Sequence, residues 1–446
     1  MEASLKSSAG TTEPESAEHL SWRWRVLIST YFGYAGYYLT RNVFASCKVP
    51  LETHFDRGAQ DIAHLWSVYL VAYLLGQLLV SSFGRRTSAR VLLLVGLGTS
   101  IVINLLFGAT NSYSTFMLLM FLNGLAQAAG WPGCIGAVAR WLLPRHRASV
   151  MGVWSTNLLL GDMMVLAISS MLLAKKGWSY AFWGCSLLAL IPWLLLLFWQ
   201  RDHPEDVDLP PLVDEPHGDG RVVLVSDGPH LPLSEYIRLA SSPVVMLMAA
   251  GYFFIKFLRY SITSWLPKFF NEMGLTSSES AFYSILPHLV GFLGMSLAGW
   301  MAIRWLRGSW ATMCLVGGLG AALGYYFVMR KVPGPVAFAC WFGLIGFMVN
   351  GADSLLKGVA CLEVAGRGNG PAVVGFVNGI ASIAPVIQEE LIGYWMGDKV
   401  PGRAIQRAMG LGFVMSLFFI LIMGAVIWRI RRGGGTRVAP RAGLQS

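Results

Sequence analysis

Charged residues are scarce in this chain of 446 residues. They make up 13% of it, against about 25% in an ordinary globular domain, while 55% of the residues are hydrophobic and the mean hydropathy is +0.55. This composition excludes a typical soluble fold and indicates a membrane protein. The 50 glycines and 17 tryptophans agree, because glycine lets membrane helices approach closely and tryptophan gathers at bilayer interfaces.

Motifs of nucleotide-dependent and hydrolytic chemistry are also missing. The chain has no Gly-rich loop ending in Lys-Ser/Thr, no His-Glu-x-x-His and no Gly-x-Ser-x-Gly. Its six cysteines are scattered, and none pairs at metal-ligand or redox-motif spacing. We therefore expect no enzyme, no cofactor, no metal site and no ATP-driven pump.

Targeting signals are absent from the start of the chain. Residues 1–20 are polar, carry four glutamates and lack the basic flank and apolar stretch of a signal peptide. No Asn-x-Ser/Thr glycosylation acceptor occurs. We expect an uncleaved chain in a bacterial cytoplasmic membrane, with the endoplasmic reticulum as the alternative.

Apolar runs of about 20 residues, long enough to cross a bilayer, recur twelve times. The first set covers 26–47, 64–83, 91–109, 114–142, 150–174 and 179–200, and the second covers 244–270, 280–303, 312–329, 335–363, 372–396 and 408–428. The sequence therefore predicts an all-α membrane protein of about twelve transmembrane helices in two six-helix bundles.

The one long polar stretch, residues 201–243, separates the two sets and is too charged to enter lipid. We expect it to be a cytoplasmic linker between the bundles. The predicted organisation is a tail at 1–25, a bundle at 26–200, the linker at 201–243, a bundle at 244–428 and a basic tail at 429–446.

Arginines gather in the loops at one end of the predicted bundles. They follow spans 2, 4, 8 and 12, as Arg85, Arg86 and Arg90, then Arg145 and Arg147, then Arg304 and Arg307, and finally Arg429, Arg431 and Arg432. Because cytoplasmic loops are rich in Lys and Arg, we expect both termini to face the cytoplasm. This distribution accounts for the net charge of +10 without nucleic acid, since it forms no continuous basic face.

Two arginines lie among apolar residues at matching places in the two halves. A Gly-Tyr pair, at 33–34 and at 251–252, precedes Arg41 and Arg259 by the same separation. A central Arg costs about 2.5–3.5 kcal/mol on insertion scales, so function is the usual reason for one. Two guanidinium groups from opposite bundles suit phosphate, because each can make two charge-assisted hydrogen bonds to it. Snorkelling from a helix end and pairing with a buried acid are the alternatives.

Neighbouring side chains extend this predicted phosphate site. Lys256 lies on nearly the same helical face as Arg259 and would either add a third cation or cap a carboxylate. Tyr34 and Tyr38 share a face of the first span, where their hydroxyl groups could donate to a ligand or their rings could simply pack.

Further polar residues inside the predicted spans need partners. Asp353 and Lys357, at i and i+4, are expected to neutralise each other. Asp162, His288 and Glu389 could gate the protein, pair with an arginine or carry a proton. We group these three with Asp353 as candidates for gating or coupling.

Four segments resemble the organophosphate:phosphate antiporter family of the major facilitator superfamily. They are GYAGYYLTRNVF at 33–44, FLNGLAQAAGWPGCIGAVARW at 121–141, GWSYAFW at 177–183 and RDHPEDVDLPP at 201–211. The resemblance spans nearly the whole chain. The family includes transporters of glycerol-3-phosphate, hexose phosphates and glucose-6-phosphate. It implies that Arg41 and Arg259 bind the phosphate, that Tyr34 and Tyr38 line the site, and that the motif at 123–132 serves helix packing and bending.

This sequence departs from the family pattern at several positions. Gln77 replaces a lysine that several members have in span 2, Leu158 replaces a histidine of the glycerol-3-phosphate type in span 5, and His288 replaces a carboxylate in span 8. The acidic residue usual in the loops after spans 2 and 8 is missing as well. The identity of the organic group is therefore left open.

The resemblance implies a secondary transporter that exchanges an organophosphate for inorganic phosphate. We expect it to work by alternating access, as a monomer in the bilayer. The alternative is a membrane sensor for extracellular hexose phosphate that works with a signalling partner, as one subgroup of the family does. A membrane scaffold without a ligand is a third class, and in it neutralising Arg41 would change nothing measurable.

Overall fold

The computed structural model describes residues 17–83, 87–142, 150–151, 154–210, 213–217, 221–224, 233–365, 370–397 and 402–432. Four of the loop arginines used above, Arg85, Arg86, Arg145 and Arg147, lie outside the described residues, as do the first sixteen residues and the last fourteen.

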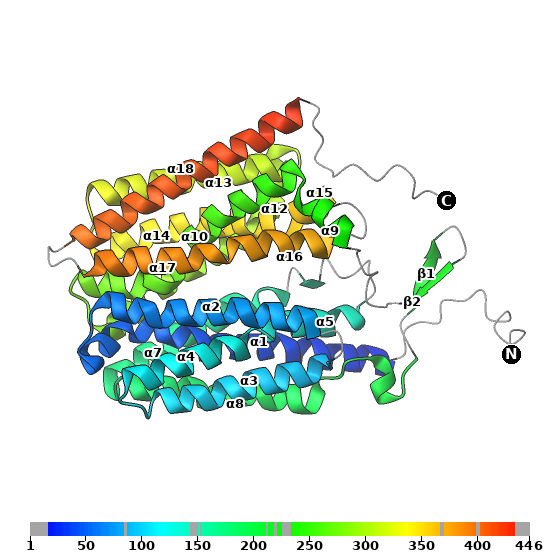
Figure 1. Ribbon diagram of the computed structural model, residues 1–446, viewed down its shortest axis with the longest axis horizontal. Helices are drawn as coiled ribbons and strands as arrows, with labels where there is room; N and C mark the ends of the chain where they lie inside the picture. Colours follow the sequence, from blue (N-terminus) through cyan, green and yellow to red (C-terminus); the bar gives the residue numbers. More distant parts are fainter. Residues whose placement is uncertain are drawn as a thin grey trace, which may run out of the picture.

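Seven helices with described bounds build the first half of the chain, shown in blue to green in Figure 1. They are α1 (Ala17–Phe55), α2 (Ala59–Phe83), α3 (Ala89–Phe107), α4 (Tyr113–Gln127), α5 (Gly130–Arg140), α7 (Asn157–Lys175) and α8 (Trp178–Trp199). Helix α1 begins nine residues before the predicted start at 26, and residues of the expected tail are therefore helical. This extension is held by Arg23 Nε, which donates to the Trp141 carbonyl at 2.9 Å.

The second half is built in the same way, with more interruptions. Its helices are α10 (Pro243–Glu272), α11 (Ser277–Tyr283), α12 (Ile285–Leu306), α13 (Trp310–Arg330), α14 (Pro335–Leu355), the π-helix η3 (Leu356–Ala360), α15 (Cys361–Ala365), α16 (Gly370–Ala381), α17 (Ile383–Met396) and α18 (Arg403–Arg431).

Ten helical segments of the described residues are long and apolar enough to cross a bilayer. Helix α1 is missing from these because its buried face is too polar, and α16 and α17 are missing because a turn at Ser382 divides one span into pieces of 12 and 14 residues. Counting α1 and the α16–α17 pair restores twelve spans, six on either side of the linker. The predicted membrane fold with two six-helix bundles is confirmed.

The linker is not purely helical or extended. It contains a 3₁₀ turn, η2 (Pro204–Val207), the short helix α9 (Leu233–Ala240), and two strands, β1 (Val213–His217) and β2 (Arg221–Leu224), which pair antiparallel with an irregularity in register. This short hairpin is a local addition to an all-α membrane fold, because a polar segment outside the bilayer is free to pair its backbone in this way. The hairpin projects beyond the helices in Figure 1.

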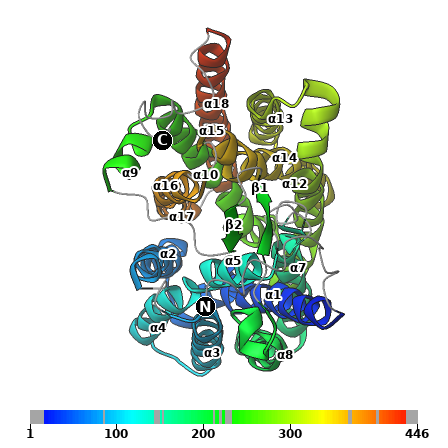
Figure 2. The same cartoon turned by 90° about the vertical axis from the view of Figure 1, so that its right-hand side faces the viewer.

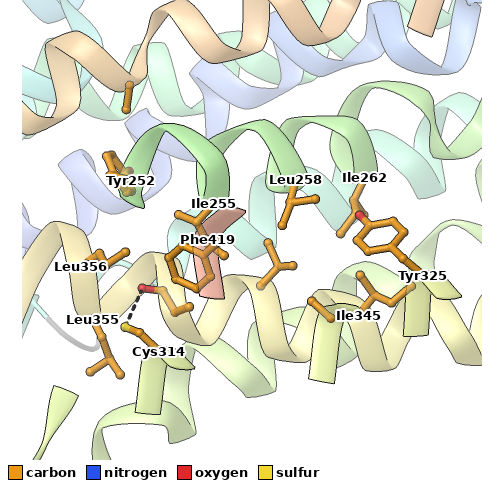
Figure 3. Close-up of a cluster of buried hydrophobic side chains, with 14 of the residues drawn as sticks. Tyr252, Ile255, Leu258, Ile262, Cys314, Tyr325, Ile345, Leu355, Leu356 and Phe419 are labelled. Atoms are coloured by element: carbon orange, nitrogen blue, oxygen red, sulfur yellow. Dashed lines mark hydrogen bonds between the residues drawn. The ribbon is translucent and has the colours of Figure 1, made fainter. Parts of the chain in front are cut away.

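The helices form two layers, one from each half, that lie side by side (Figures 1 and 2). Each half has its own hydrophobic core. Figure 3 shows part of the second core, where Leu258 and Ile262 of α10 approach Tyr325 and Ile345, and where the Cys314 thiol lies 3.8 Å from the Ala352 carbonyl. Large apolar side chains on the outer faces, among them Val95, Ile303 and Leu421, are exposed, as lipid contact requires.

Helix α1 begins and α18 ends on the same side of the molecule, which we call the terminus end, and the opposite side is the far end (Figure 1). The halves meet closely at the far end, where α2 packs on α17 and α7 on α11. Gly393 of α17 permits this contact, since an added methyl group would overlap Ala63 of α2. The molecule is thus joined across its two halves at the far end.

Candidate functional site

A cavity lies between the two halves. Helices α1, α2, α7 and α10 supply its walls, and both Arg41 of α1 and Arg259 of α10 line it. The structure therefore brings together the two arginines that lie 218 positions apart in the sequence. The other lining residues are Tyr38, Asn42, Ala45, Trp66, Tyr69, Leu70, Tyr73, Asp162, Tyr260, Thr263 and Ser264.

Arg41 is held by neutral groups. Its Nε donates to the Gln127 side-chain oxygen at 3.3 Å, and its guanidinium carbon lies 4.8 Å from the ring centre of Tyr73 and 5.4 Å from that of Tyr38. The Gln127 amide nitrogen is itself oriented by the Thr40 hydroxyl at 2.8 Å. Arg41 is 9% exposed, and its buried Nη2 has no hydrogen-bond partner among the described residues. A buried donor of this kind is suited to an acceptor that enters the cavity.

Arg259 has a charged partner instead. Its Nε lies 3.5 Å from Oδ1 of Asp353, a fully buried carboxylate on α14. Lys357 donates to the other oxygen of Asp353 at 2.7 Å, so the expected Asp353–Lys357 pair is present and is shared with Arg259. Lys357 lies in the π-helix η3, a type of interruption that is common at functional sites.

A second cavity adjoins the first and shares Tyr38, Asp162, Arg259 and Thr263 with it. His288 of α12 lines only the second cavity. Asp162 of α7 accepts a hydrogen bond from the Asn42 amide, and Gly161 beside it lets α7 pack directly on Tyr38. Two of the candidate gating residues therefore face the space between the halves.

Three other predicted residues lie outside both cavities. Tyr34 packs in an aromatic cluster, with ring centres 5.3 Å from Trp131 and 5.6 Å from Tyr38. The Lys256 ammonium donates to the Asn378 side-chain oxygen at 3.0 Å and to the Ser382 hydroxyl at 2.8 Å. Both partners are neutral, and no carboxylate of the described residues lies within ion-pair distance of Lys256.

Glu389, the third of these residues, belongs to a buried network at the far end. Lys48 of α1 pairs with it, and its second oxygen accepts hydrogen bonds from Ser264 and Trp265 of α10, both at 2.8 Å. Lys48 is 1% exposed and Glu389 is fully buried. The network therefore joins the first half to the second through a desolvated ion pair.

Two further ion pairs cross between the halves at the same end. Lys268 of α10 pairs with Glu52 of α1 at 2.7 Å, and His64 of α2 lies 2.9 Å from Glu390 of α17. These contacts are more exposed than the Lys48–Glu389 pair. Together the three pairs would have to separate for the far end to open.

Three residues of these contacts were not predicted from the sequence, namely Lys48, Asn42 and Tyr73. Lys48 follows Arg41 by two helical turns, so the helical period places it on nearly the same face, and this spacing could have revealed it. Nothing in the sequence ties Tyr73 to Arg41. Of the departures from the family pattern, Leu158 lines the second cavity, while Gln77 lines neither cavity.

The fold and the cavity define a membrane protein with a central site between two helical bundles, the arrangement of secondary transporters. A family model for the Major Facilitator Superfamily matches residues 30–388. The chain belongs to the major facilitator superfamily. This membership agrees with the expectation that the chain is a membrane transporter and not an enzyme.

Relatives with similar sequences include a membrane sensor protein and two transport proteins named for phosphate esters. The chain is 26% identical over 396 residues to the membrane sensor protein UhpC of Salmonella typhimurium, covering 85% of this chain and 88% of the relative. It is 24% identical to the glycerol-3-phosphate transporter of Bacillus subtilis, covering 93% and 88%. It is 25% identical to a probable hexose phosphate transport protein of Chlamydia pneumoniae, covering 81% and 82%.

Solved structures with the same fold are more distant in sequence. A bacterial homolog of the human lysosomal transporter Spinster, in an inward-facing and unoccupied conformation, matches with a TM-score of 0.71 at 16% identity, covering 94% of this chain and 99% of that one. The likeness supports the fold of the two bundles.

Proposed function

We propose that this protein exchanges a phosphate ester for inorganic phosphate across the membrane by alternating access. The observation that carries the proposal is that Arg41 and Arg259, one from each half, line a single cavity. The relatives named as phosphate-ester transporters support it. Two guanidinium groups in a water-poor cavity favour a doubly charged tetrahedral anion over neutral solutes.

Arg41 and Arg259 grip the phosphoryl group in this mechanism. Arg41 is oriented by Gln127 and by the faces of Tyr38 and Tyr73, so its unpartnered Nη2 is preorganised for a phosphate oxygen. Arg259 reaches the same ligand while it keeps its contact with Asp353. The Tyr38 hydroxyl is a further donor at the cavity wall.

Lys256 and Tyr34 act behind this site. Lys256 adds positive charge one helical turn before Arg259, and its neutral hydrogen-bond partners leave that charge uncompensated by a direct ion pair. Tyr34 supports the ring of Tyr38 by packing against it.

The structure represents the state in which the far end is closed. Lys48–Glu389, Lys268–Glu52 and His64–Glu390 hold α1 and α2 against α10 and α17 there, and transport would break these contacts as the halves rock around the ligand. The loop arginines support a cytoplasmic terminus end, since cytoplasmic loops are rich in Lys and Arg. The far end then faces outward.

Obligatory exchange follows from the charge of the empty site. Without an anion, Arg41 and Arg259 line one cavity whose lining holds a single carboxylate, Asp162. The carboxylate of Asp353, outside that cavity, is shared between Arg259 and Lys357. Moving the halves together around this excess positive charge is unfavourable in a low-dielectric space. A bound phosphate group removes the repulsion, so the loaded carrier moves and the empty one does not.

The test is uptake of labelled phosphate by proteoliposomes that contain the purified protein and internal phosphate. We expect saturable uptake that requires the internal phosphate and is inhibited by external phosphate esters. Arg41→Gln and Arg259→Gln should each lower the rate at least 100-fold, since each removes charge-assisted hydrogen bonds to the ligand. Arg330→Gln, on an exposed arginine at the end of α13, is the matched control and should exchange normally. Near-normal exchange by Arg259→Gln would refute the assignment.

A sensor is the second candidate function, favoured by the similarity to a membrane sensor protein. A sensor of this fold would bind phosphate esters through the same two arginines but would show no counterflow. Ligand-induced thermal stabilisation that depends on Arg41, in a protein without measurable exchange, would support the sensor and would direct the search to a signalling partner.

A further inference from the structure

The second cavity has a composition unlike that of the first. Its apolar wall consists of Leu158, Leu159, Ile262, Pro287, Phe292 and Met295. Asp162 of α7, His288 of α12 and Asn350 of α14 interrupt this wall with hydrogen-bonding side chains. Tyr38, Arg259 and Thr263 add further hydrogen-bonding groups where the second cavity borders the first. Ligand pockets are commonly apolar with a few placed polar groups that fix the orientation of the ligand.

The second cavity adjoins the proposed phosphate-binding site. Arg259 and Tyr38 border both cavities, so a ligand whose phosphoryl group lies between Arg41 and Arg259 has the second cavity directly beside it.

Two polar side chains of the second cavity have hydrogen-bond partners in the protein and can still accept further hydrogen bonds. His288 Nδ1 lies 2.7 Å from the Ser284 carbonyl oxygen, which can only accept, so this nitrogen carries the proton and Nε2 is left for another partner. Asp162 receives one hydrogen bond from the Asn42 amide, and an ionised carboxylate can accept several more. These groups can accept hydrogen bonds from hydroxyl groups.

We propose that the second cavity receives the organic part of the substrate, and that Asp162 and His288 select a neutral polyhydroxylated group, as in an aldose phosphate. The proposal rests on the proposed function of the neighbouring arginine site. A sugar ring has apolar faces that suit Leu158, Ile262 and Phe292, and a rim of hydroxyl groups that suit the three polar side chains. The Asp162 carboxylate disfavours a second anionic group, so phosphorylated three-carbon acids should bind weakly.

Competition for phosphate exchange measures this selectivity. Unlabelled glucose-6-phosphate, glycerol-3-phosphate and phosphoenolpyruvate are compared by the concentration that halves the uptake of labelled phosphate into phosphate-loaded proteoliposomes. We expect glucose-6-phosphate to act at a concentration at least tenfold lower than phosphoenolpyruvate, with glycerol-3-phosphate between them. Equal potency, or phosphoenolpyruvate as the best competitor, would overturn the proposal.

Two variants assign the selectivity to residues. The selectivity is the ratio of the phosphoenolpyruvate concentration that halves uptake to the glucose-6-phosphate concentration that does so. Asp162→Asn should lower this ratio about tenfold, because it removes the repelling charge and weakens a hydrogen bond to a charged acceptor. His288→Leu should raise the glucose-6-phosphate concentration that halves uptake about tenfold, relative to the concentration of unlabelled phosphate that does the same. Asp61→Asn and His54→Leu, at residues that line neither cavity, are the matched controls and should keep both ratios. Unchanged ratios in both site variants would remove these residues from substrate selection.

Deoxy analogues give a test that does not depend on the folding of any variant. In the unaltered protein, removal of at least one ring hydroxyl from glucose-6-phosphate should weaken competition about tenfold or more, since a buried polar group is left unpaired. Equal competition by every deoxy analogue would overturn the proposal.

Failure of the two proposals can be told apart. If the protein shows no exchange, the same compounds are ranked by thermal stabilisation of the detergent-solubilised protein. A preserved order, with glucose-6-phosphate well ahead of phosphoenolpyruvate, would refute only the antiporter. If the protein exchanges phosphate but the three compounds compete equally well, only the sugar selectivity would be refuted.

Discussion

Arg41 and Arg259 occupy matching positions in the two halves, yet their partners differ in charge. Arg41 is held by the Gln127 amide and by tyrosine rings, and no described carboxylate lies within ion-pair distance of it. Arg259 lies beside Asp353, which Lys357 also neutralises. Span 4 supplies the partner in the first half and span 10 supplies it in the second, so the repeat keeps the geometry while the chemistry diverges.

This difference teaches which arginine offers its charge most fully to a ligand. A phosphate group has no competitor for Arg41, whereas at Arg259 it competes with Asp353. The neutral supports of Arg41 keep it in place without cancelling its charge, and cation–π contacts of about 0.5–2 kcal/mol suffice for this purpose. The partner of a buried cation therefore indicates the role of that cation.

The largest effect is expected at a third buried cation, Lys48, which is fully paired. Lys48→Met should lower the stability of the folded protein by about 3–5 kcal/mol, because it leaves the Glu389 carboxylate buried without its partner. Its effect on phosphate affinity should stay below about threefold, since Lys48 lines neither cavity. Thermal unfolding in detergent, with and without phosphate, measures both quantities.

The double variant Lys48→Met/Glu389→Leu is the control for this prediction. It removes both charges and should recover most of the lost stability. A phosphate affinity that falls as steeply in Lys48→Met as in an arginine variant would show that pairing does not separate structural cations from ligand-binding ones.

The comparison of the two arginines is tested directly by phosphate affinity. Arg41→Gln should weaken binding of phosphate about 100-fold and Arg259→Gln only about tenfold, because Asp353 already offsets part of the Arg259 charge. Calorimetric titration of the detergent-solubilised variants gives both constants. Equal losses, or a larger loss at Arg259, would contradict the inference that pairing lowers the contribution of an arginine to binding.

A smaller effect of opposite sign is expected at Asp353. Asp353→Asn removes the competitor for Arg259 and should raise phosphate affinity about fivefold, while stability falls because Arg259 and Lys357 lose their shared carboxylate. The same titration shows the first effect, and thermal unfolding shows the second. Weaker phosphate binding in this variant would indicate that Asp353 orients Arg259 for the ligand more than it competes with it.

The smallest effect concerns the ring over Arg41. Tyr73→Phe keeps the aromatic face and should change phosphate affinity less than about twofold, whereas Tyr73→Leu removes the face and should weaken binding about fivefold. A loss in Tyr73→Phe as large as that in Tyr73→Leu would assign the effect to the hydroxyl group instead of the ring.

Much of the fold could be predicted from the sequence, because hydrophobic runs of bilayer length, a polar linker and repeated arginines are local features. The Asp353–Lys357 pair was predictable too, since i,i+4 neighbours meet on any helix. Helix ends and the linker hairpin were not, because α1 continues beyond the bilayer and the linker folds outside it. Tyr34 and Tyr38 looked alike by spacing, but only Tyr38 lines a cavity.

The sequence by itself determined the environment of this protein, the two sets of six spans and the matching places of Arg41 and Arg259, since the bilayer constrains length and charge directly. Only the tertiary structure decided the partner of each buried charge. Lys48 and Glu389 are 341 residues apart, and their pairing depends on how α1 and α17 are rotated and packed. Charges on distant helices meet through that packing, and no pattern along the chain records it.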